Sequence, residues 1–381
     1  MDHTLVIPTF NRSDLLLKLL RYYKKRSPTL KILILDSSST DNADANIINV
    51  KLFGEGLVYK AFPQTTPMSV KLRDGLKLVQ TKYVSFCADD DLIFTEHINK
   101  AIIFLENHSD YVSAHGRYIN FNNVNKNVRV WLEYSGPGNE AAHAGARIFQ
   151  MCQSYESLFY GVFKTHNLQN IFKGVADQSS LHFQELFQSV ASLITGKVYR
   201  FNEIYAARQS GPPADPDRDN WQTYYWFSSN PQDFMKHYMI YREYISDYYQ
   251  TYGQQPLTEK NEFLRILDLS HSIYFSAHCP SHYFFTTIQN NFTDNYKEPF
   301  HKNSSDIIIH RIAVWERRFE KLKNYFTKSR KALIRSLNQQ VWDLCINKFR
   351  CRLPWDAREL ANDESFHQSY IEVCLYLDNK P

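Results

Sequence analysis

Three consecutive aspartates, Asp89, Asp90 and Asp91, have the clearest capacity for chemistry in this sequence. Neighbouring carboxylates on one turn repel each other unless a cation lies among them. A hard divalent ion, Mg²⁺ or Mn²⁺, held by one or two carboxylates together with substrate phosphates, meets that requirement. The alternative is a solvated acidic turn. Because the acids directly follow the buried strand-like run 83–87, the sequence favours a metal site.

Two other polar turns, Thr9–Arg12 and Asp36–Asp41, also directly follow apolar strand-like runs. The predicted strands cover residues 4–8, 31–36, 57–59 and 83–87, and predicted helices begin at Ser13 and Met68. Fully apolar strands separated by amphipathic helices indicate a Rossmann-like α/β fold, with a mostly parallel sheet covered on both faces. Because ligands bind at the carboxyl ends of such strands, we expect the three polar turns to share one rim of the sheet.

The remainder of the chain changes character twice. Residues 110–210 mix short strands with a helix at 179–195, and the pattern beyond residue 220 is almost wholly helical. We therefore predict an α/β domain over residues 1–218 and a mainly α-helical C-terminal domain over 219–381. The polar, proline-rich segment 208–218 is either a linker between them or a loop over the site.

The composition excludes several classes of protein. The 44 basic residues against 40 acidic ones give a net charge of +4, too balanced for a nucleic-acid-binding protein. We find no apolar run near the roughly 18 residues of a membrane span and no basic leader. Six scattered cysteines without CxxC pairs predict a reduced, cytoplasmic chain. The glycine-rich phosphate loops GxxxxGK[ST] and GxGxxG are absent.

Together, the three turns resemble those of family 2 glycosyltransferases with the GT-A fold. The similar stretches are Val6–Arg12, Ile34–Asp41 and Val84–Leu92, and the resemblance is specific over residues 4–95. It implies a nucleotide-sugar donor, with Asp36 reading the base and the Thr9–Arg12 turn lining the nucleoside. It implies Mn²⁺ or Mg²⁺ on a DxD motif formed by Asp89 and Asp91. The donor-binding residues expected on this basis are Pro8, Thr9, Asn11, Arg12, Asp36, Ser38, Asp89, Asp90 and Arg208.

The sequence departs from the family pattern in two places. Ala88 stands where the commoner motif has its first acid, and Ser37–Ser39 replaces the usual Asp-Gly-Ser. Which aspartate of the acid turn takes the metal is therefore left open.

Inverting members of this family need a carboxylate base, which they usually place in a Glu-Asp pair at the start of a helix before a glycine and a strand. The matching stretch here, 182–201, lacks that pair. Glu185 is the only acid in the helix and Asp177 lies just before it, so either of them, or neither, is the base. Arg208, which follows the next strand-like run, suits bidentate pairing with the diphosphate.

These features predict a metal-dependent, inverting and non-processive transferase. It moves one sugar from a nucleotide sugar, with a UDP-sugar favoured, to a glycan, lipid-linked or protein acceptor. A nucleotidyltransferase is one alternative, although the glycine-rich signature usual in that class is missing. A non-catalytic protein that binds glycans or nucleotide sugars on the same fold is another.

One segment of the helical region carries a charge pattern of its own. Residues 315–335 hold eight bases and two acids, with aromatic and aliphatic side chains near one helical face. A basic amphipathic helix of this kind can lie on an anionic membrane, which would place the enzyme at the inner face. The alternative is a core helix of the C-terminal domain. The C-terminal helices are also the predicted contact of a homo-oligomer.

Overall fold

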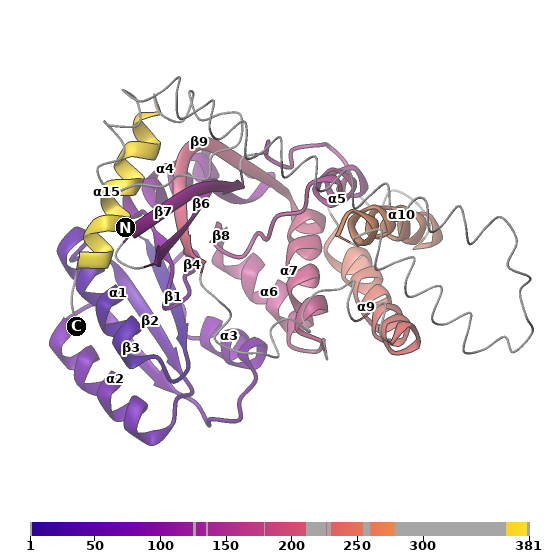
Figure 1. Cartoon of the computed structure of the whole chain (residues 1–381). Coiled ribbons are helices and arrows are strands. Elements are labelled where there is room, and N and C mark those ends of the chain that lie inside the picture. Colours follow the sequence, from indigo (N-terminus) through magenta and orange to yellow (C-terminus); the bar gives the residue numbers. More distant parts are fainter. Residues whose placement is uncertain are drawn as a thin grey trace, which may run out of the picture.

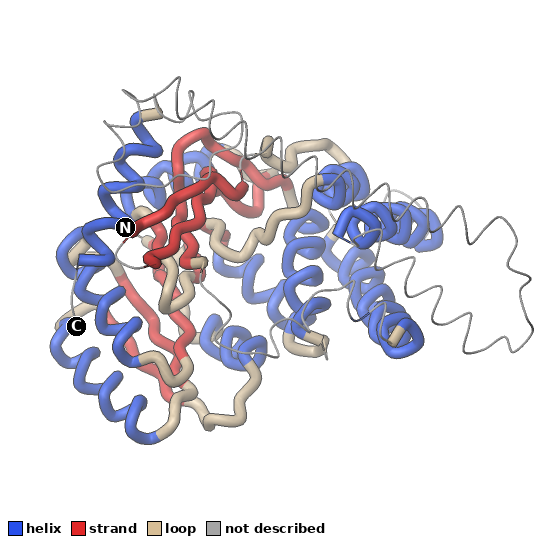
Figure 2. Tube along the Cα trace, viewed as in Figure 1, coloured by secondary structure: helices blue, strands red, loops and turns tan. Residues whose placement is uncertain are grey.

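The structure is a computed structural model, and it describes residues 2–124, 127–134, 136–178, 180–210, 226, 230–253, 260–278 and 363–378. These residues form a mixed β-sheet with helices on both faces (Figures 1 and 2). The strands are β1 (His3–Thr9), β2 (Lys31–Asp36), β3 (Leu57–Ala61), β4 (Tyr83–Phe86), β5 (Leu92–Ile93), β6 (Tyr111–Val124), β7 (Asn127–Tyr134), β8 (Val162–Lys164) and β9 (Lys197–Gln209). The helices are α1 (Ser13–Arg26), α2 (Thr40–Phe53), α3 (Met68–Leu76), α4 (Thr95–Asn107), α5 (Ala144–Gln153), α6 (Thr165–Val175), α7 (Leu181–Thr195), α9 (Pro231–Tyr252), α10 (Lys260–His278) and α15 (Glu364–Asp378).

The strand order is β3-β2-β1-β4-β8-β6-β9-β5, with β7 paired to β6 outside this path. The first four strands in this order are mutually parallel, as the sequence predicts. Strand β8 then pairs antiparallel with both β4 and β6, whereas β6 and β9 run parallel. Because the first four strands are parallel, the polar turns after β1, β2 and β4 lie at the same edge of the sheet, which we call the carboxyl rim.

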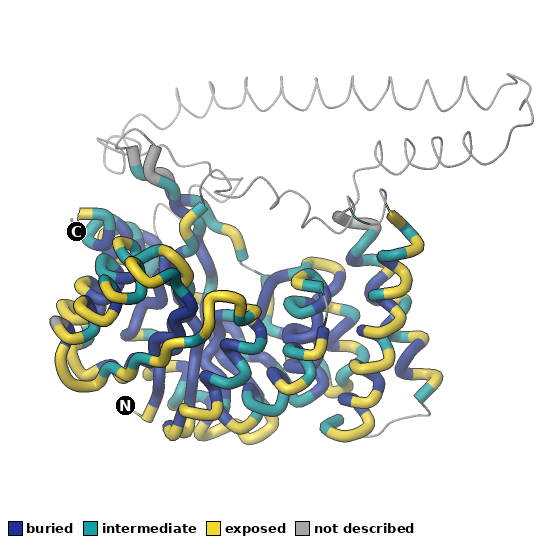
Figure 3. Tube along the Cα trace, turned by 90° about the horizontal axis from the view of Figure 1, so that it is seen from below, coloured by how far each residue is buried: buried dark blue, intermediate teal, exposed yellow. Residues whose placement is uncertain are grey.

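Alternation along the strands builds a hydrophobic core on each face of the sheet. In β1, Leu5 and Ile7 join the core under α1 and α4, whereas Val6 joins the core under α3, α6 and α7. Successive side chains of a strand point to opposite faces, so a fully apolar strand requires cover on both. Figure 3 shows the result, a buried sheet with exposure concentrated on the outer surfaces of the helices.

Helix α3 packs very closely against β2. A Cβ atom at Gly75 would overlap the side chain of Leu35, so glycine lets the two elements approach without moving that side chain. The close approach matters for the site because α3 also carries Lys71 to the carboxyl rim.

The described helices after residue 230, α9, α10 and α15, pack on both sides of the α/β core. Helices α9 and α10 contact α7 and α5 and share the hydrophobic core of that face (Figure 1). Helix α15 instead contacts α1 and β9 on the other face. The domain boundary predicted at residue 218 falls outside the described residues and stays a prediction. Segment 315–335 and residues 211–218 of the proline-rich segment also lie outside them.

Polar contacts hold α15 against α1. The carboxylate of Glu372 is only 2% exposed, accepts a 2.8 Å hydrogen bond from the Tyr22 hydroxyl and forms an ion pair with Arg26. Arg117 forms a further ion pair with Asp363, just before the helix. Within the described ranges, no helix is both long and apolar enough to cross a membrane.

Candidate active site

The first and third polar turns meet at the carboxyl rim, as predicted. The Thr9 hydroxyl donates a 2.7 Å hydrogen bond to Asp89. One nitrogen of Arg12, Nη1, lies 3.1 Å from an oxygen of Asp89 and 2.9 Å from an oxygen of Asp90. The guanidinium therefore supplies a positive charge to two of the three acids. Pro8 lies buried within β1, one residue before this cluster.

The second turn joins the same rim through Asn11. This residue adopts a left-handed backbone conformation with φ 55°, which asparagine tolerates better than most residues. Its backbone N–H donates to the Ser38 hydroxyl at 2.8 Å, and its side-chain oxygen accepts a 2.8 Å bond from the backbone of Ser39. The turns after β1 and β2 are thereby cross-linked.

Asp36 ends β2 and is 1% exposed. One of its oxygens accepts a 2.7 Å hydrogen bond from the backbone N–H of Ser38. The other accepts 2.7 Å bonds from the Asn46 side chain and the Tyr59 hydroxyl. In this arrangement the carboxylate orients its own turn and two neighbouring side chains. Its contact with a nucleobase stays a prediction.

Lys71 is a site residue that the sequence analysis missed. It is 2% exposed, and its ammonium donates to the backbone oxygen of Thr9 at 2.8 Å and to the Ser37 hydroxyl at 2.9 Å. Burial lowers its pKa to about 8, although Asp36 and Asp89 act in the opposite direction. The buried lysine thus links the turn after β1 to the turn after β2. Its position on the apolar face of α3, next to Leu72, is the only signal in the sequence.

The third acid, Asp91, points away from the Arg12 contact. Its carboxylate accepts a short hydrogen bond from the Tyr160 hydroxyl and a 2.6 Å bond from the backbone N–H of Gln209. Burial, with the adjacent Asp90, raises the pKa of Asp91 to about 7, and burial raises that of Asp89 to about 6. A cation placed among these acids would lower both pKa values.

The acid turn, Asp89–Asp91, can supply only some of the ligands that a divalent ion needs. Among the described residues, no group of three or more His, Cys, Asp or Glu side chains is arranged to hold a metal. Asp90 is the most exposed of the three acids, and only one of its oxygens has a hydrogen-bond partner in the described parts of the chain. Such a turn suits Mg²⁺ or Mn²⁺, which commonly bind one or two carboxylates and complete their shell with water and phosphate oxygens.

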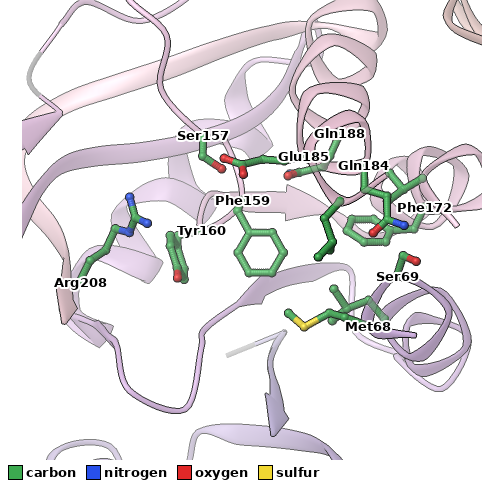
Figure 4. Close-up of a pocket in the computed structure, with 13 residues that line it drawn as sticks. Met68, Ser69, Ser157, Phe159, Tyr160, Phe172, Gln184, Glu185, Gln188 and Arg208 are labelled. Atoms are coloured by element: carbon green, nitrogen blue, oxygen red, sulfur yellow. The ribbon is translucent and has the colours of Figure 1, made fainter. Parts of the chain in front are cut away.

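A cavity of about 180 Å³ adjoins the rim and receives two of the predicted residues. Glu185, on the second turn of α7, and Arg208, near the end of β9, both line it (Figure 4). Tyr160 lines it as well and connects it to the acid turn through Asp91. Asp177 is exposed and is not among the lining residues. The structure therefore brings Glu185 and Arg208 to one cavity and leaves Asp177 outside.

Aromatic rings fix the direction of Arg208. The guanidinium carbon lies 5.8 Å from the ring centre of Tyr134 and 5.9 Å from that of Tyr160, and Nη1 donates to the Tyr134 hydroxyl at 3.3 Å. A guanidinium held between ring faces keeps its charge and loses little freedom on binding an anion. Glu185 is half-buried and accepts a 3.3 Å hydrogen bond from the Tyr155 hydroxyl.

Comparison with protein families assigns this arrangement to a class. The model of the family described as Glycosyl transferase family 2 matches residues 4–179. This range contains the three polar turns, Lys71 and Tyr160, and ends before Glu185 and Arg208. Residues 4–179 are therefore a family 2 glycosyltransferase domain with the GT-A fold. The predictions of that fold and of a nucleotide-sugar-dependent glycosyltransferase are confirmed.

The chain is similar at low identity to several solved structures of one protein. TarS 1–349 of S. aureus in complex with UDP-GlcNAc has 16% identity and a TM-score of 0.49, over 72% of this chain and 73% of that one. The same segment in complex with UDP has 14% identity and a TM-score of 0.42, over 78% and 93%. S. aureus TarS itself has 13% identity and a TM-score of 0.40, over 80% and 56%. No curated protein matches the sequence.

Proposed function

We propose that this enzyme transfers a single sugar, with inversion, from a UDP-sugar to a hydroxyl of a glycan, lipid-linked or protein acceptor. The observation that carries the proposal is the cavity in which Glu185 and Arg208 meet beside the acid turn. A base and a phosphate-binding cation on opposite sides of a bound sugar are what a single displacement at its anomeric carbon requires.

In this mechanism Glu185 accepts the proton of the acceptor hydroxyl as that oxygen attacks the anomeric carbon. The bond to the diphosphate breaks as the new bond forms, so the sugar carbon passes through an oxocarbenium-like state. Arg208 pairs with the negative charge that builds on the leaving diphosphate. Asp177 is the weaker candidate for the base because it is exposed outside the cavity.

The remaining donor contacts follow the carboxyl rim. We assign the nucleoside to the turn of Pro8, Thr9, Asn11 and Arg12 with Ser38, and the uracil N–H to Asp36. Asp89 and Asp91, with Asp90, would hold Mn²⁺ or Mg²⁺. Such an ion, when bound, neutralises charge on the diphosphate and so makes it a better leaving group.

The position of the enzyme in the cell is a separate proposal. We propose a cytoplasmic enzyme that contacts the inner face of the membrane through residues 315–335 and that forms homo-oligomers through its C-terminal helices. Sedimentation with anionic and neutral vesicles tests the membrane contact: binding only to anionic vesicles, and weaker binding at high salt, is expected.

One assay separates the proposed activity from its alternatives. The enzyme is incubated with a panel of nucleotide sugars, with and without Mn²⁺, and the released phosphates are identified. Release of nucleoside diphosphate from one donor, stimulated by Mn²⁺, is the expected result. Pyrophosphate from a nucleoside triphosphate and a sugar phosphate would indicate a nucleotidyltransferase. Binding of nucleotide sugars without any release, in the presence of candidate acceptors, would indicate a non-catalytic protein.

A further inference from the structure

Tyr160 contacts both the acid turn and the arginine assigned to the diphosphate. Its hydroxyl donates a hydrogen bond to the buried carboxylate of Asp91, and its ring centre lies 5.9 Å from the guanidinium carbon of Arg208. Figure 4 shows the side chain between Arg208 and Phe159, whose ring centre lies 5.2 Å from that of Tyr160. Because Tyr160 comes from the segment between α5 and β8, it belongs to neither of the two elements that it joins.

A second hydrogen bond joins Asp91 to the strand that carries Arg208. The other oxygen of Asp91 accepts a 2.6 Å bond from the backbone N–H of Gln209, which directly follows Arg208 in β9. The contacts form a closed network: Asp91 bonds to Tyr160, whose ring contacts Arg208, and the residue after Arg208 bonds back to Asp91. Residues that share one network of contacts are energetically coupled, so a change at one of them is felt by the others.

This network restrains Arg208 at its backbone and at its guanidinium. The bond from Gln209 fixes the backbone next to the acid turn, and the pairing of Leu92 with Ala207 continues that connection between β5 and β9. The ring of Tyr160 restrains the guanidinium. A buried carboxylate needs hydrogen-bond donors in any fold. Here, however, one donor belongs to the side chain that touches Arg208 and the other to the residue that follows it, so the acid turn helps to set the position of the arginine.

We propose that Tyr160 is a positioning residue for the diphosphate of the donor, because it makes Asp91 and Arg208 act as one unit. The inference rests on the proposed function, in which Arg208 pairs with the leaving diphosphate. Charged groups stabilise a building charge best when they are fixed in place before it develops. The Tyr160 hydroxyl gives its single proton to Asp91, so it acts on the diphosphate through Arg208 and not as a donor to the phosphate itself.

A comparison of UDP with uridine measures the contribution of this unit. Calorimetry in the presence of EDTA gives the ratio of the two affinities, which depends on the groups that bind the diphosphate and is independent of any metal. Tyr160→Phe keeps the ring and removes the hydrogen bond to Asp91, so we expect the UDP-to-uridine ratio to fall about 3- to 10-fold. The affinity for uridine should not change. The fall is partial because Tyr134 also contacts Arg208.

Two further variants separate positioning from a loss of stability. Tyr22→Phe is the matched control, because it also removes a hydrogen bond from a buried tyrosine to a buried carboxylate, that of Glu372 at 2.8 Å, but under α15. It should lower the stability in urea and leave the ratio unchanged. Arg208→Gln should lower the ratio about 10- to 100-fold. In the Arg208→Gln background, Tyr160→Phe should have little further effect on the ratio, which would identify Arg208 as the group through which Tyr160 acts.

The outcomes that contradict the inference differ from those that contradict the function. If Arg208→Gln leaves the ratio unchanged, the role proposed for Arg208 at the diphosphate is wrong, and this inference with it. If Arg208→Gln lowers the ratio but Tyr160→Phe does not, only the positioning role of Tyr160 is overturned. The same conclusion follows if the effects of these two substitutions are additive, or if Tyr22→Phe lowers the ratio as much as Tyr160→Phe does.

Discussion

Replacing Glu185 by glutamine is the most direct test of the assigned base. The substitution keeps the size of the side chain and an oxygen that can accept from Tyr155, but the amide cannot take a proton. General base catalysis contributes about 10²–10⁴-fold to the rate. We therefore expect kcat/KM for sugar transfer to fall by this factor, which is about 3–5 kcal/mol of transition-state stabilisation.

The stability of the fold should hardly respond to the same change. Glu185 is half-buried, and the hydrogen bond that it accepts from Tyr155 is long, at 3.3 Å. The glutamine oxygen can still accept from Tyr155, so exchanging this long, half-exposed bond to a carboxylate for one to an amide changes the free energy of unfolding by only about 1 kcal/mol. Loss of activity at nearly unchanged stability separates a catalytic role from a structural one.

The assay measures release of nucleoside diphosphate as a function of donor concentration, which gives kcat/KM. Calorimetry gives the donor affinity, and urea unfolding gives the stability. Asp177→Asn provides the matched comparison, because it makes the same chemical change at the rival carboxylate. We expect wild-type kcat/KM from that variant. The reasoning is refuted if Glu185→Gln stays within about threefold of wild type, or if Asp177→Asn shows the 10²-fold loss instead.

Three further results are expected. Asp91→Asn should abolish Mn²⁺-dependent turnover and also lower the free energy of unfolding by about 1–3 kcal/mol, because one partner of the buried carboxylate is left unpaired; unchanged urea stability would contradict the bond from Tyr160. Burial lowers the pKa of Lys71 to about 8 in the folded protein, from 10.5 for an exposed lysine, so between these pH values the unfolded chain binds more protons and the free energy of unfolding should rise with pH. In Lys71→Met that rise, roughly 1–3 kcal/mol, should vanish when urea titrations at pH 7.5 and pH 10 are compared. Ending the chain before α15 should cost several kcal/mol of urea stability through lost apolar burial, whereas Ile371→Ser on the exposed side of that helix should be neutral.

Local periodicity is the reason that the first hundred residues are predictable from sequence. Short apolar runs such as residues 31–36 are typical of buried strands. When such strands run parallel, the turns that follow them lie at one edge of the sheet. Helix α2 is less evident, because its apolar residues do not gather on one face. The antiparallel insertion of β8 between β4 and β6 has no local signature either, since it depends on pairing between distant segments.

The site residues likewise divide into those that local sequence predicts and those that depend on contacts between distant segments. Residue type and position at a strand end indicate Thr9, Arg12 and the acid turn. The contact of Lys71 with Thr9 joins residues 62 positions apart, and that of Tyr160 with Asp91 joins residues 69 positions apart. No local sequence pattern predicts either contact. Burial decides their roles, and burial is a property of the finished fold rather than of any short stretch of sequence.

The packing of α15 on α1 has a consequence for the order in which this protein is made. The hydrogen bond between Tyr22 and Glu372 joins residues 350 positions apart. At about 5–20 residues per second, a ribosome needs roughly 20 to 70 s to travel from one to the other. Throughout that interval the face of α1 that α15 will cover lacks its partner helix, and it still lacks it once residues 1–218 have all been synthesised. The packing of this face is therefore among the last contacts of the fold to form during synthesis.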